Sequence, residues 1–284
     1  MREILSAADM RTWSDRTRAA GQRIGFVPTM GYLHEGHVSL VAEARRRTDA
    51  CVASIFVNPL QFGPSEDLDR YPRDLPRDRA ALAAAGVDVL YLPSAPALYP
   101  SHFQTEVTVT EVTTGLCGRS RPGHFRGVTT VVAKLFNAVK PHVAVFGEKD
   151  FQQLAVIKRM AADLDTGIEV VGAPIVRESD GVAMSSRNAY LAADERRAAR
   201  CLSRALAAAR EALAGGARER AALLAAAEAG LAAEPLARVD YAELVDVDRL
   251  QPVERVADAA LLALAVFIGR TRLIDNTVLT VPQA

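Results

Sequence analysis

Apolar runs of strand length recur along the first part of this chain, and segments with helical periodicity separate them. Strands that are apolar throughout and alternate with helices are typical of a parallel sheet covered on both faces. The predicted strands are residues 24–28, 51–57, 87–92, 143–146 and 168–171, and the predicted helices are residues 37–47, 75–85, 127–139 and 151–164. We therefore expect an α/β domain with a parallel sheet over residues 1–175.

The rest of the chain has a different character. Helices rich in Ala, Leu and Arg are predicted over residues 194–213 and 218–231, and strand-like stretches follow at residues 239–245, 260–268 and 272–279. This order predicts a smaller α+β domain over residues 176–284. Residues 104–112 alternate polar and apolar side chains, which predicts a two-sided strand or hairpin outside the main sheet.

Charge and cysteine content argue against several classes of protein. Lys+Arg and Asp+Glu balance at 34 each, so we expect no nucleic-acid partner. Cys51, Cys117 and Cys201 form neither a metal-binding pair nor a disulfide framework, which is typical of reduced thiols in a cytoplasmic protein. The N-terminal segment lacks the apolar core of a signal peptide, and the longest apolar run, residues 259–269, is too short to span a bilayer. We therefore expect no membrane partner.

Two histidines, His34 and His37, stand where the first predicted strand feeds a helix. The N-terminus of a helix suits a phosphate, and Gly36 lets the phosphate approach the backbone. The imidazoles can donate hydrogen bonds to an α-phosphate as charge builds on it. The competing interpretation is a pair of surface histidines at a helix cap, but the strand–turn–helix context favours the phosphate site. No metal site is expected, because the motif is not HExxH and no suitable third ligand follows.

Two further polar motifs also follow predicted strands. In SIFVNPLQF, a buried strand ends at Asn58 and presents Gln61, whose amide can hold hydroxyls and a carboxylate; a plain turn is the alternative. In GEKDFQQ, Lys149 can reach phosphates, whereas Asp150 could serve only as a helix cap. All but four of the basic residues are arginine, so a lysine in a motif is notable. Gln153 lies one helical turn further on, near the same face.

Two polar loops complete the pattern. The segment RESDGVAMSSRN brings Ser185, Ser186 and Arg187 together, and these groups can hold β- and γ-phosphates in a loop that closes; a simple helix cap is the alternative. Residues 118–127 are glycine-rich and basic, which indicates either a flap over the site or a solvated loop.

Four of these motifs, in this order and spacing, resemble the pantothenate synthetase family: the histidine pair HxGH, SIFVNPLQF, GEKDFQQ and RESDGVAMSSRN. HxGH and MSSR alone mark the wider nucleotidylyltransferase superfamily, whereas their combination with SIFVNPLQF, GEKDFQQ and RESDGVAMSSRN is far more specific. The resemblance covers nearly the whole chain. It implies a Rossmann-like N-terminal domain, a smaller C-terminal domain that covers the cleft, a homodimer, and ATP carried with Mg²⁺.

The resemblance also implies roles for individual residues. His34, His37 and Lys149 would act in catalysis. Pantoate and β-alanine would be held by Gln61, Gln153, Asn58, Tyr71 and Arg121. The implied ATP site comprises Met30, Gly31, Tyr32, Leu33, His34, Glu35, Gly36, His37, Gly147, Glu148, Lys149, Asp150, Val176, Met184, Ser185, Ser186 and Arg187.

The implied reaction is the ATP-dependent ligation of pantoate and β-alanine to pantothenate. The pantoate carboxylate attacks the α-phosphate and releases pyrophosphate, and β-alanine then displaces AMP from the pantoyl adenylate. A nucleotide-forming adenylyltransferase is one alternative, but it should need more cations facing its acceptor. A tRNA synthetase is disfavoured by the neutral charge and the lack of room for an anticodon domain. A non-catalytic ATP-binding regulator is the alternative from another class.

Overall fold

The computed structural model of the chain describes residues 1–64 and 66–281. These residues form two compact units. The first comprises Met1–Thr110, Arg121–Glu148 and Gln153–Val176, and the second comprises Glu111–Ser120, Lys149–Gln152 and the chain from Arg177 onward. A domain boundary between residues 175 and 176 stays a prediction.

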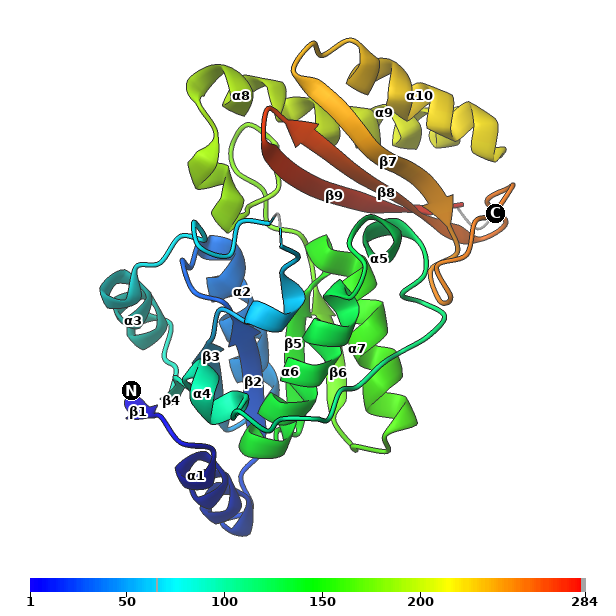
Figure 1. Cartoon of the computed structure of the whole chain (residues 1–284). Coiled ribbons are helices and arrows are strands. Elements are labelled where there is room, and N and C mark those ends of the chain that lie inside the picture. Colours follow the sequence, from blue (N-terminus) through cyan, green and yellow to red (C-terminus); the bar gives the residue numbers. More distant parts are fainter. Residues whose placement is uncertain (65, 282–284) are drawn as a thin grey trace. The chain divides into compact units, whose positions relative to one another are not determined.

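A six-stranded parallel sheet forms the centre of the first unit (Figure 1). Its strand order is β1-β4-β3-β2-β5-β6. The strands are β1 (Arg2–Ile4), β2 (Ile24–Thr29), β3 (Ala50–Ile55), β4 (Val89–Tyr91), β5 (Val143–Gly147) and β6 (Glu169–Ala173). From β2 the chain adds β3 and β4 on one side and later adds β5 on the other, so the strand order reverses between β2 and β5. Ligands of open α/β sheets bind at the carboxyl ends of the strands beside such a reversal.

Helices cover both faces of this sheet because its central strands are apolar on both faces. On β2, Val27 packs in a cluster with Leu40 and Val41 of α2. The preceding residue, Phe26, meets Phe136 of α6, with ring centroids 6.4 Å apart. Successive side chains of a strand point to opposite faces, so α2 and α6 lie on opposite faces of the sheet. The helices and 3₁₀ turns are α1 (Ala7–Ala19), α2 (Glu35–Arg47), η1 (Pro59–Gln61), α3 (Leu75–Ala84), α4 (Ala95–Leu98), α6 (His124–Val139), η2 (Glu148–Asp150) and α7 (Phe151–Asp163). Lys149–Gln152, at the junction of η2 and α7, belong to the second unit.

The second unit is built on a three-stranded antiparallel sheet in which β8 lies between β7 and β9. Leu262, Leu264 and Val266 alternate along β8 and share an apolar cluster with Leu206 of α9 and Leu223 of α10. This cluster is the core of the unit. Its elements are α5 (Leu116–Ser120), η3 (Ser186–Tyr190), α8 (Ala193–Ala198), α9 (Arg200–Ala214), α10 (Arg220–Ala232), β7 (Ala237–Val245), β8 (Ala259–Ile268) and β9 (Thr271–Thr280).

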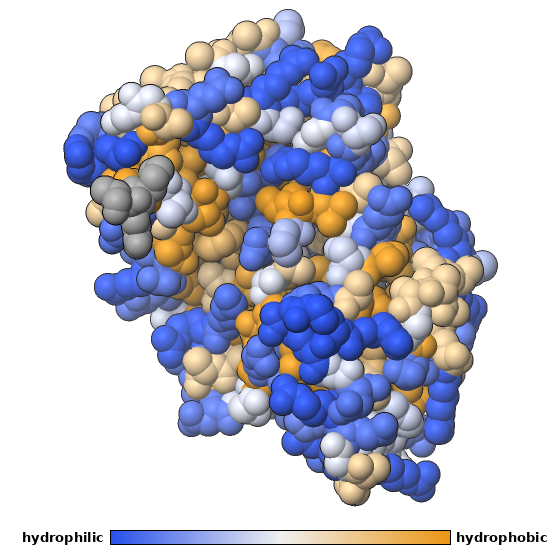
Figure 2. Space-filling view, turned by 180° about the vertical axis from the view of Figure 1, so that it is seen from behind, coloured by the Kyte–Doolittle hydropathy of each residue, from blue (hydrophilic) through white to orange (hydrophobic). Residues whose placement is uncertain are grey.

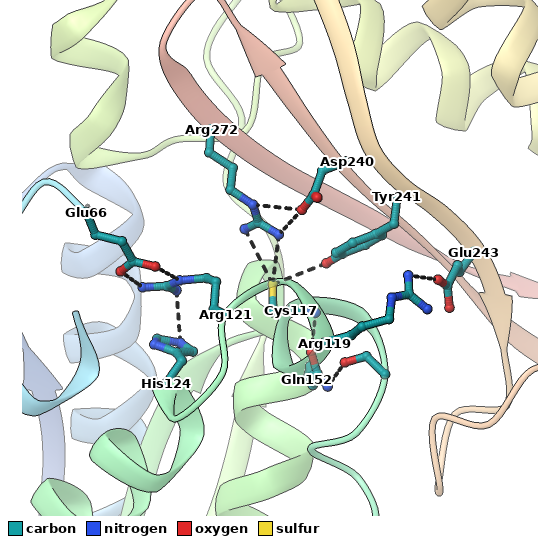
Figure 3. Close-up of polar contacts among 11 residues, drawn as sticks. Glu66, Cys117, Arg119, Arg121, His124, Gln152, Asp240, Tyr241, Glu243 and Arg272 are labelled. Atoms are coloured by element: carbon teal, nitrogen blue, oxygen red, sulfur yellow. Dashed lines mark hydrogen bonds and ion pairs between the residues drawn. The ribbon is translucent and has the colours of Figure 1, made fainter. Parts of the chain in front are cut away.

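Helix α5 joins the second unit through Cys117 (Figure 3). The Cys117 sulfur lies 3.2 Å from the Tyr241 hydroxyl and 3.5 Å from two guanidinium nitrogens of Arg272. Arg272 also pairs with Asp240 at 2.8 Å, and burial raises the pKa of Tyr241. The Cys117 amide donates to Gln152 at 2.9 Å. These contacts explain why residues 111–120 and 149–152 belong to this unit rather than to the first.

The predicted α/β fold with a smaller α+β C-terminal part is confirmed. The strand predicted over residues 104–112 is wrong: this segment is irregular, and Val107 bonds to Thr129 and Thr130 side chains of α6 instead of to a neighbouring strand. The helix predicted over residues 194–213 is two helices that meet at Ala199. There the Ala199 carbonyl accepts a hydrogen bond from the amide of Leu202, only three residues further on. Residues 118–127 are not one loop, since they end α5 and begin α6.

Within the described part of the chain, no helix combines the length and the apolar character needed to cross a membrane. The face shown in Figure 2 carries mostly hydrophilic side chains, with smaller apolar areas between them. The large apolar side chains that are exposed come from separate elements and loops. They are Met1, Leu5, Leu60, Leu164, Leu236, Val239 and Val278.

Gly127 of α6 allows this helix to approach η1 closely. A methyl group at this position would lie 2.2 Å from the Leu60 carbonyl oxygen and 2.7 Å from the Gln61 amide nitrogen. We expect Gly127→Ala to lower the free energy of unfolding by about 1–3 kcal/mol, because backbone atoms must move apart. Urea denaturation followed by circular dichroism measures the change.

Gly230→Ala on α10 is the matched control. The methyl group added at Gly230 would lie 3.9 Å from the Ala205 Cα atom, which is an ordinary contact. We therefore expect the free energy of unfolding to rise by about 0.5–1 kcal/mol, because alanine has the better helix propensity. If Gly127→Ala were as stable as the wild-type protein, the close approach of α6 and η1 would be contradicted.

Candidate active site

Two predicted motifs, and the start of a third, lie at the carboxyl ends of adjacent strands in the first unit. Residues 30–37 follow β2, residues 56–62 follow β3, and Glu148 follows β5. These strands are neighbours in the order β3-β2-β5. Because parallel strands end at the same edge, the sheet gathers these polar segments beside the reversal of strand order.

His34 and His37 form the start of α2. His34 is the N-cap residue, and its carbonyl oxygen accepts the His37 amide at 2.8 Å. The His34 amide in turn donates to Nδ1 of His37 at 3.3 Å, and the two ring centroids are 4.1 Å apart. Since Nδ1 is an acceptor here, the neutral His37 ring carries its proton on Nε2. His37 therefore offers a hydrogen-bond donor at Nε2.

The turn before α2 directs its amides into the protein. Tyr32 and Leu33 donate their N–H groups to the two oxygens of Asp78, at 2.8 and 2.7 Å. Asp78 is a buried residue of α3. The first two helical residues, Glu35 and Gly36, follow this turn, and first-turn amides have no partner within their own helix. An anion at this helix N-terminus would therefore meet Glu35 and Gly36 rather than the preceding turn.

The side chain of Gln61 is held by Asn58, which is buried. Asn58 donates to Gln61 Oε1 at 3.0 Å and to the Gly127 carbonyl at 3.1 Å. Its own oxygen accepts from the Tyr99 hydroxyl at 2.9 Å and from the Leu60 amide at 3.3 Å. Burial raises the pKa of Tyr99, so this hydroxyl stays protonated. Asn58 thus uses both donors and both acceptor positions on protein groups.

Arg121 and His124 hold the main chain of Gln61, and Figure 3 shows Arg121 between His124 and Glu66. Arg121 donates to the Gln61 carbonyl at 3.2 Å and to His124 Nε2 at 3.0 Å, so His124 Nδ1 is the donor to the same carbonyl at 2.9 Å. Glu66 accepts two hydrogen bonds of 2.6 Å from Arg121. Burial alone would raise the pKa of Glu66, but the hydrogen bonds and charge of Arg121 lower it. In this structure Arg121 is therefore engaged by Glu66 and Gln61.

In the second unit, Lys149 and Ser185 line one recess, together with Asn188. The side-chain amide of Asn276 fixes the main chain of Lys149 by donating to its carbonyl at 2.9 Å. Ser185 caps η3 by accepting the Arg187 amide at 3.3 Å. The structure thus brings together Lys149 and Ser185, which belong to motifs that lie far apart in the sequence.

The remaining predicted residues have varied surroundings. Tyr71 is buried, and its ring meets Phe62 edge-on with centroids 6.0 Å apart. Gln61 Nε2 lies 3.2 Å from the Met30 sulfur. Asp150 is exposed and lies 3.8 Å from the Lys149 ammonium. Gln153, Val176 and Met184 are half-buried, and Ser186 is buried.

Sequence reasoning missed Glu66, Asp78, His124 and Asn276 as contacts of the predicted residues. These contacts join residues as far apart as 46 positions for Asp78 and 127 positions for Asn276, so no local pattern marks them. Among residues 1–64 and 66–281, no group of three or more His, Cys, Asp or Glu side chains could hold a metal ion.

Comparisons with known proteins point to one family along nearly the whole chain. A family model described as Pantoate-beta-alanine ligase matches residues 3–278. The pantothenate synthetase of Heliobacterium modesticaldum is 58% identical over 281 residues, which cover 99% of this chain and 100% of that protein. The crystal structure of pantothenate synthetase from Thermus thermophilus is similar with a TM-score of 0.93 and 49% identity, covering 98% of this chain and 99% of that one. A pantoate-beta-alanine ligase from Francisella tularensis, complexed with "Beta-gamma ATP" and β-alanine, is similar with a TM-score of 0.78 and 32% identity, covering 98% and 97%.

The hydrogen bonds of Asn58 give a stability prediction. Asn58→Ala would leave Gln61 Oε1, the Gly127 carbonyl and the Tyr99 hydroxyl without this partner. Each buried polar group that loses its partner costs about 1–3 kcal/mol, so we expect a total loss of roughly 2–5 kcal/mol in the free energy of unfolding. Tyr99→Phe removes only one of these bonds and should cost about 1 kcal/mol. Urea denaturation of both variants tests this, and equal costs would contradict the described network.

Proposed function

The chain belongs to the pantoate–β-alanine ligase family, and from this membership we propose that it joins pantoate to β-alanine with consumption of ATP. The observation that carries the mechanism is His37 at the start of α2, whose Nδ1 accepts the His34 amide, so that the neutral ring carries its proton on Nε2. It stands at the carboxyl end of β2, beside the reversal of strand order. A donor fixed in this way can stabilise charge that develops on a phosphate oxygen.

The chemistry requires activation of the carboxylate. A carboxylate and an amine do not condense at neutral pH, because oxide is a poor leaving group. Attack of the pantoate carboxylate on the α-phosphate expels pyrophosphate and forms pantoyl adenylate. The β-alanine amine then attacks the acyl carbon, and AMP departs with the bridging oxygen. The protein contributes by positioning the reactants and stabilising charge, and no protein nucleophile is needed.

We propose that the α-phosphate of ATP binds at the start of α2. Glu35 and Gly36 would offer first-turn amides, and His37 would donate through Nε2, with His34 beside it. Lys149 and Ser185, which share a recess in the second unit, would hold the departing pyrophosphate. The other proposed ATP residues are Met30, Gly31, Tyr32, Leu33, Gly147, Glu148, Asp150, Val176, Met184, Ser186 and Arg187.

We propose that Gln61 and Gln153 hold pantoate. Asn58 occupies Gln61 Oε1, and one hydrogen of Nε2 points to the Met30 sulfur, so the other Nε2 hydrogen would donate to a pantoate oxygen. Asn58 fixes the side chain of Gln61 and Arg121 fixes its main chain. Tyr71 contributes by packing edge-on against Phe62, the residue that follows Gln61. A neutral amide can orient the pantoate carboxylate without the strong ion pair that a cation would form.

We propose further that Mg²⁺ enters with ATP, that the protein is a homodimer and that it works in the cytoplasm. The described side chains offer no cluster of three metal ligands, so the ion would be held by phosphate oxygens and water. When bound, it would neutralise phosphate charge. The three free cysteines, Cys51, Cys117 and Cys201, are all buried, which fits the proposed cytoplasmic location.

Pyrophosphate release measured with and without pantoate tests the function. We expect release that requires both ATP and pantoate and does not require β-alanine for the first turnover. A nucleotide-forming adenylyltransferase would instead respond to a phosphorylated acceptor. A non-catalytic regulator would bind ATP without releasing pyrophosphate under any of these conditions, and that result would refute the proposal.

His37→Ala tests the donor assignment. Removing one preorganised donor to a transition-state oxyanion typically costs about 10²–10³ in rate, so we expect that loss in pantoate-dependent pyrophosphate release. His102→Ala is the control, because His102 is exposed and lies outside the four motifs. Near-normal turnover of a folded His37→Ala protein would remove His37 from the mechanism.

A further inference from the structure

The carboxylate of Asp78 holds the turn that precedes α2. Asp78 is only 1% exposed, and its two oxygens accept the amides of Tyr32 and Leu33. A buried carboxylate needs such bonds to offset its lost hydration, and bonds to a charged acceptor are stronger than neutral ones. Asp78 is carried by α3, which is capped at its N-terminus by Asp74 and anchored in the apolar core by Leu82. The position of the Asp78 carboxylate is therefore fixed by the helix that carries it.

The turn itself has a backbone that needs support. Gly31 and Tyr32 are both left-handed, with φ of +83° and +50°. A residue with a Cβ atom rarely adopts this conformation, so the surroundings must maintain it at Tyr32. A Cβ atom at Gly31 would also lie only 3.0 Å from Asp78 Oδ2. The guanidinium of Arg77, also on α3, lies 5.3 Å from the Tyr32 ring centroid, so α3 contacts both the main chain and the side chain of this turn.

Successive amides that converge on one anion form a nest, and nests elsewhere bind phosphates. Here the nest made by Tyr32 and Leu33 is filled by a carboxylate of the protein itself. Because Asp78 occupies the amides of Tyr32 and Leu33, a phosphate at this helix N-terminus would bind the next amides, those of the first helical turn, and His37.

We propose that Asp78 is a positioning residue for His37. By fixing Tyr32 and Leu33 it sets the place of the next amide, that of His34, and this amide holds Nδ1 of His37. Asp78 acts through the turn and does not touch substrate. The inference rests on the proposed function for its kinetic consequence, whereas its effect on the hydrogen bonding of His37 depends on the structure alone.

Asp78→Asn is the direct test. It keeps the shape of the side chain but replaces one acceptor with an NH₂ group that faces an amide donor. Leu82→Ala on the same helix is the control, because it removes core packing and leaves the carboxylate intact. Both variants are assayed for pantoate-dependent pyrophosphate release at temperatures where circular dichroism shows them folded. The ¹⁵N imidazole spectrum of His37 reports whether Nδ1 still accepts a hydrogen bond.

We expect Asp78→Asn to lower kcat by about 10–100-fold while changing KM for ATP and pantoate by less than about threefold, because a misplaced group acts mainly in the transition state. Its His37 Nδ1 signal should move toward that of a free imidazole. Leu82→Ala should lower the melting temperature but keep kcat within about threefold of wild type. If both variants lost turnover equally, or if Asp78→Asn left kcat and the His37 spectrum unchanged, the proposal would be overturned.

A second pair of variants covers the case in which Asp78→Asn does not fold. Arg77 and Arg79 both lie on α3. Arg77→Ala removes a contact with Tyr32, whereas Arg79→Ala removes an exposed ion pair with Glu3 of β1. We expect a shift of the His37 Nδ1 signal and a loss of kcat of about 2–5-fold in Arg77→Ala alone. Identical behaviour of the two variants would overturn the proposal. A wild-type protein without pantoate-dependent pyrophosphate release would refute the proposed function, and the His37 spectra would still decide the role of Asp78.

Discussion

Burial of β2 on both faces is the constraint on which the candidate site depends. Val27 faces the cluster that includes α2, and Phe26 faces α6, so the strand can offer polar groups only at its ends. The same holds for β3 and β5, whose residues are almost all buried. A ligand can therefore meet this sheet at the carboxyl edge, where the segments after β2, β3 and β5 leave it. The chemistry is placed there because the side chains on both faces of the central strands are mostly apolar and buried.

The polar groups at that edge are held by a second set of buried and half-buried polar groups. Asn58 fixes the side chain of Gln61, Arg121 and His124 fix its main chain, and Asp78 fixes the turn before His34. The donors and acceptors in these hydrogen bonds have their partners inside the protein. The polar groups at the sheet edge that remain for a ligand are therefore few, and their orientations are defined. This order suits a reaction in which the protein supplies position and charge rather than a nucleophile.

The sequence predicts the site correctly where the pattern is local in the chain. The apolar runs that became β2, β3 and β5 lead directly into the polar motifs, so the positions of His37, Gln61 and Glu148 at strand ends follow from strand–loop–helix patterns, and the family resemblance is confirmed by the matched family. It was insufficient where contacts are distant in the chain, as between Asp78 and Leu33 or between Asn276 and Lys149. Residues 104–112 alternate polar and apolar side chains, but Val107 bonds to side chains of α6, so tertiary contacts override the pattern.

Helix α1 was missed because most of its residues are exposed and only Met10, Ser14 and Thr17 are buried.

If an acyl adenylate links the two halves of the reaction, one oxygen atom of the pantoate carboxylate must end on AMP. Pantoate labelled with ¹⁸O in its carboxylate is incubated with ATP, β-alanine and the protein, and the nucleotide product is analysed by mass spectrometry. If the carboxylate attacks the α-phosphate, the bridging oxygen stays on phosphorus when β-alanine displaces AMP. We therefore expect one ¹⁸O atom in AMP per turnover. Unlabelled AMP, or label recovered in orthophosphate instead, would contradict it even if pantothenate were still formed.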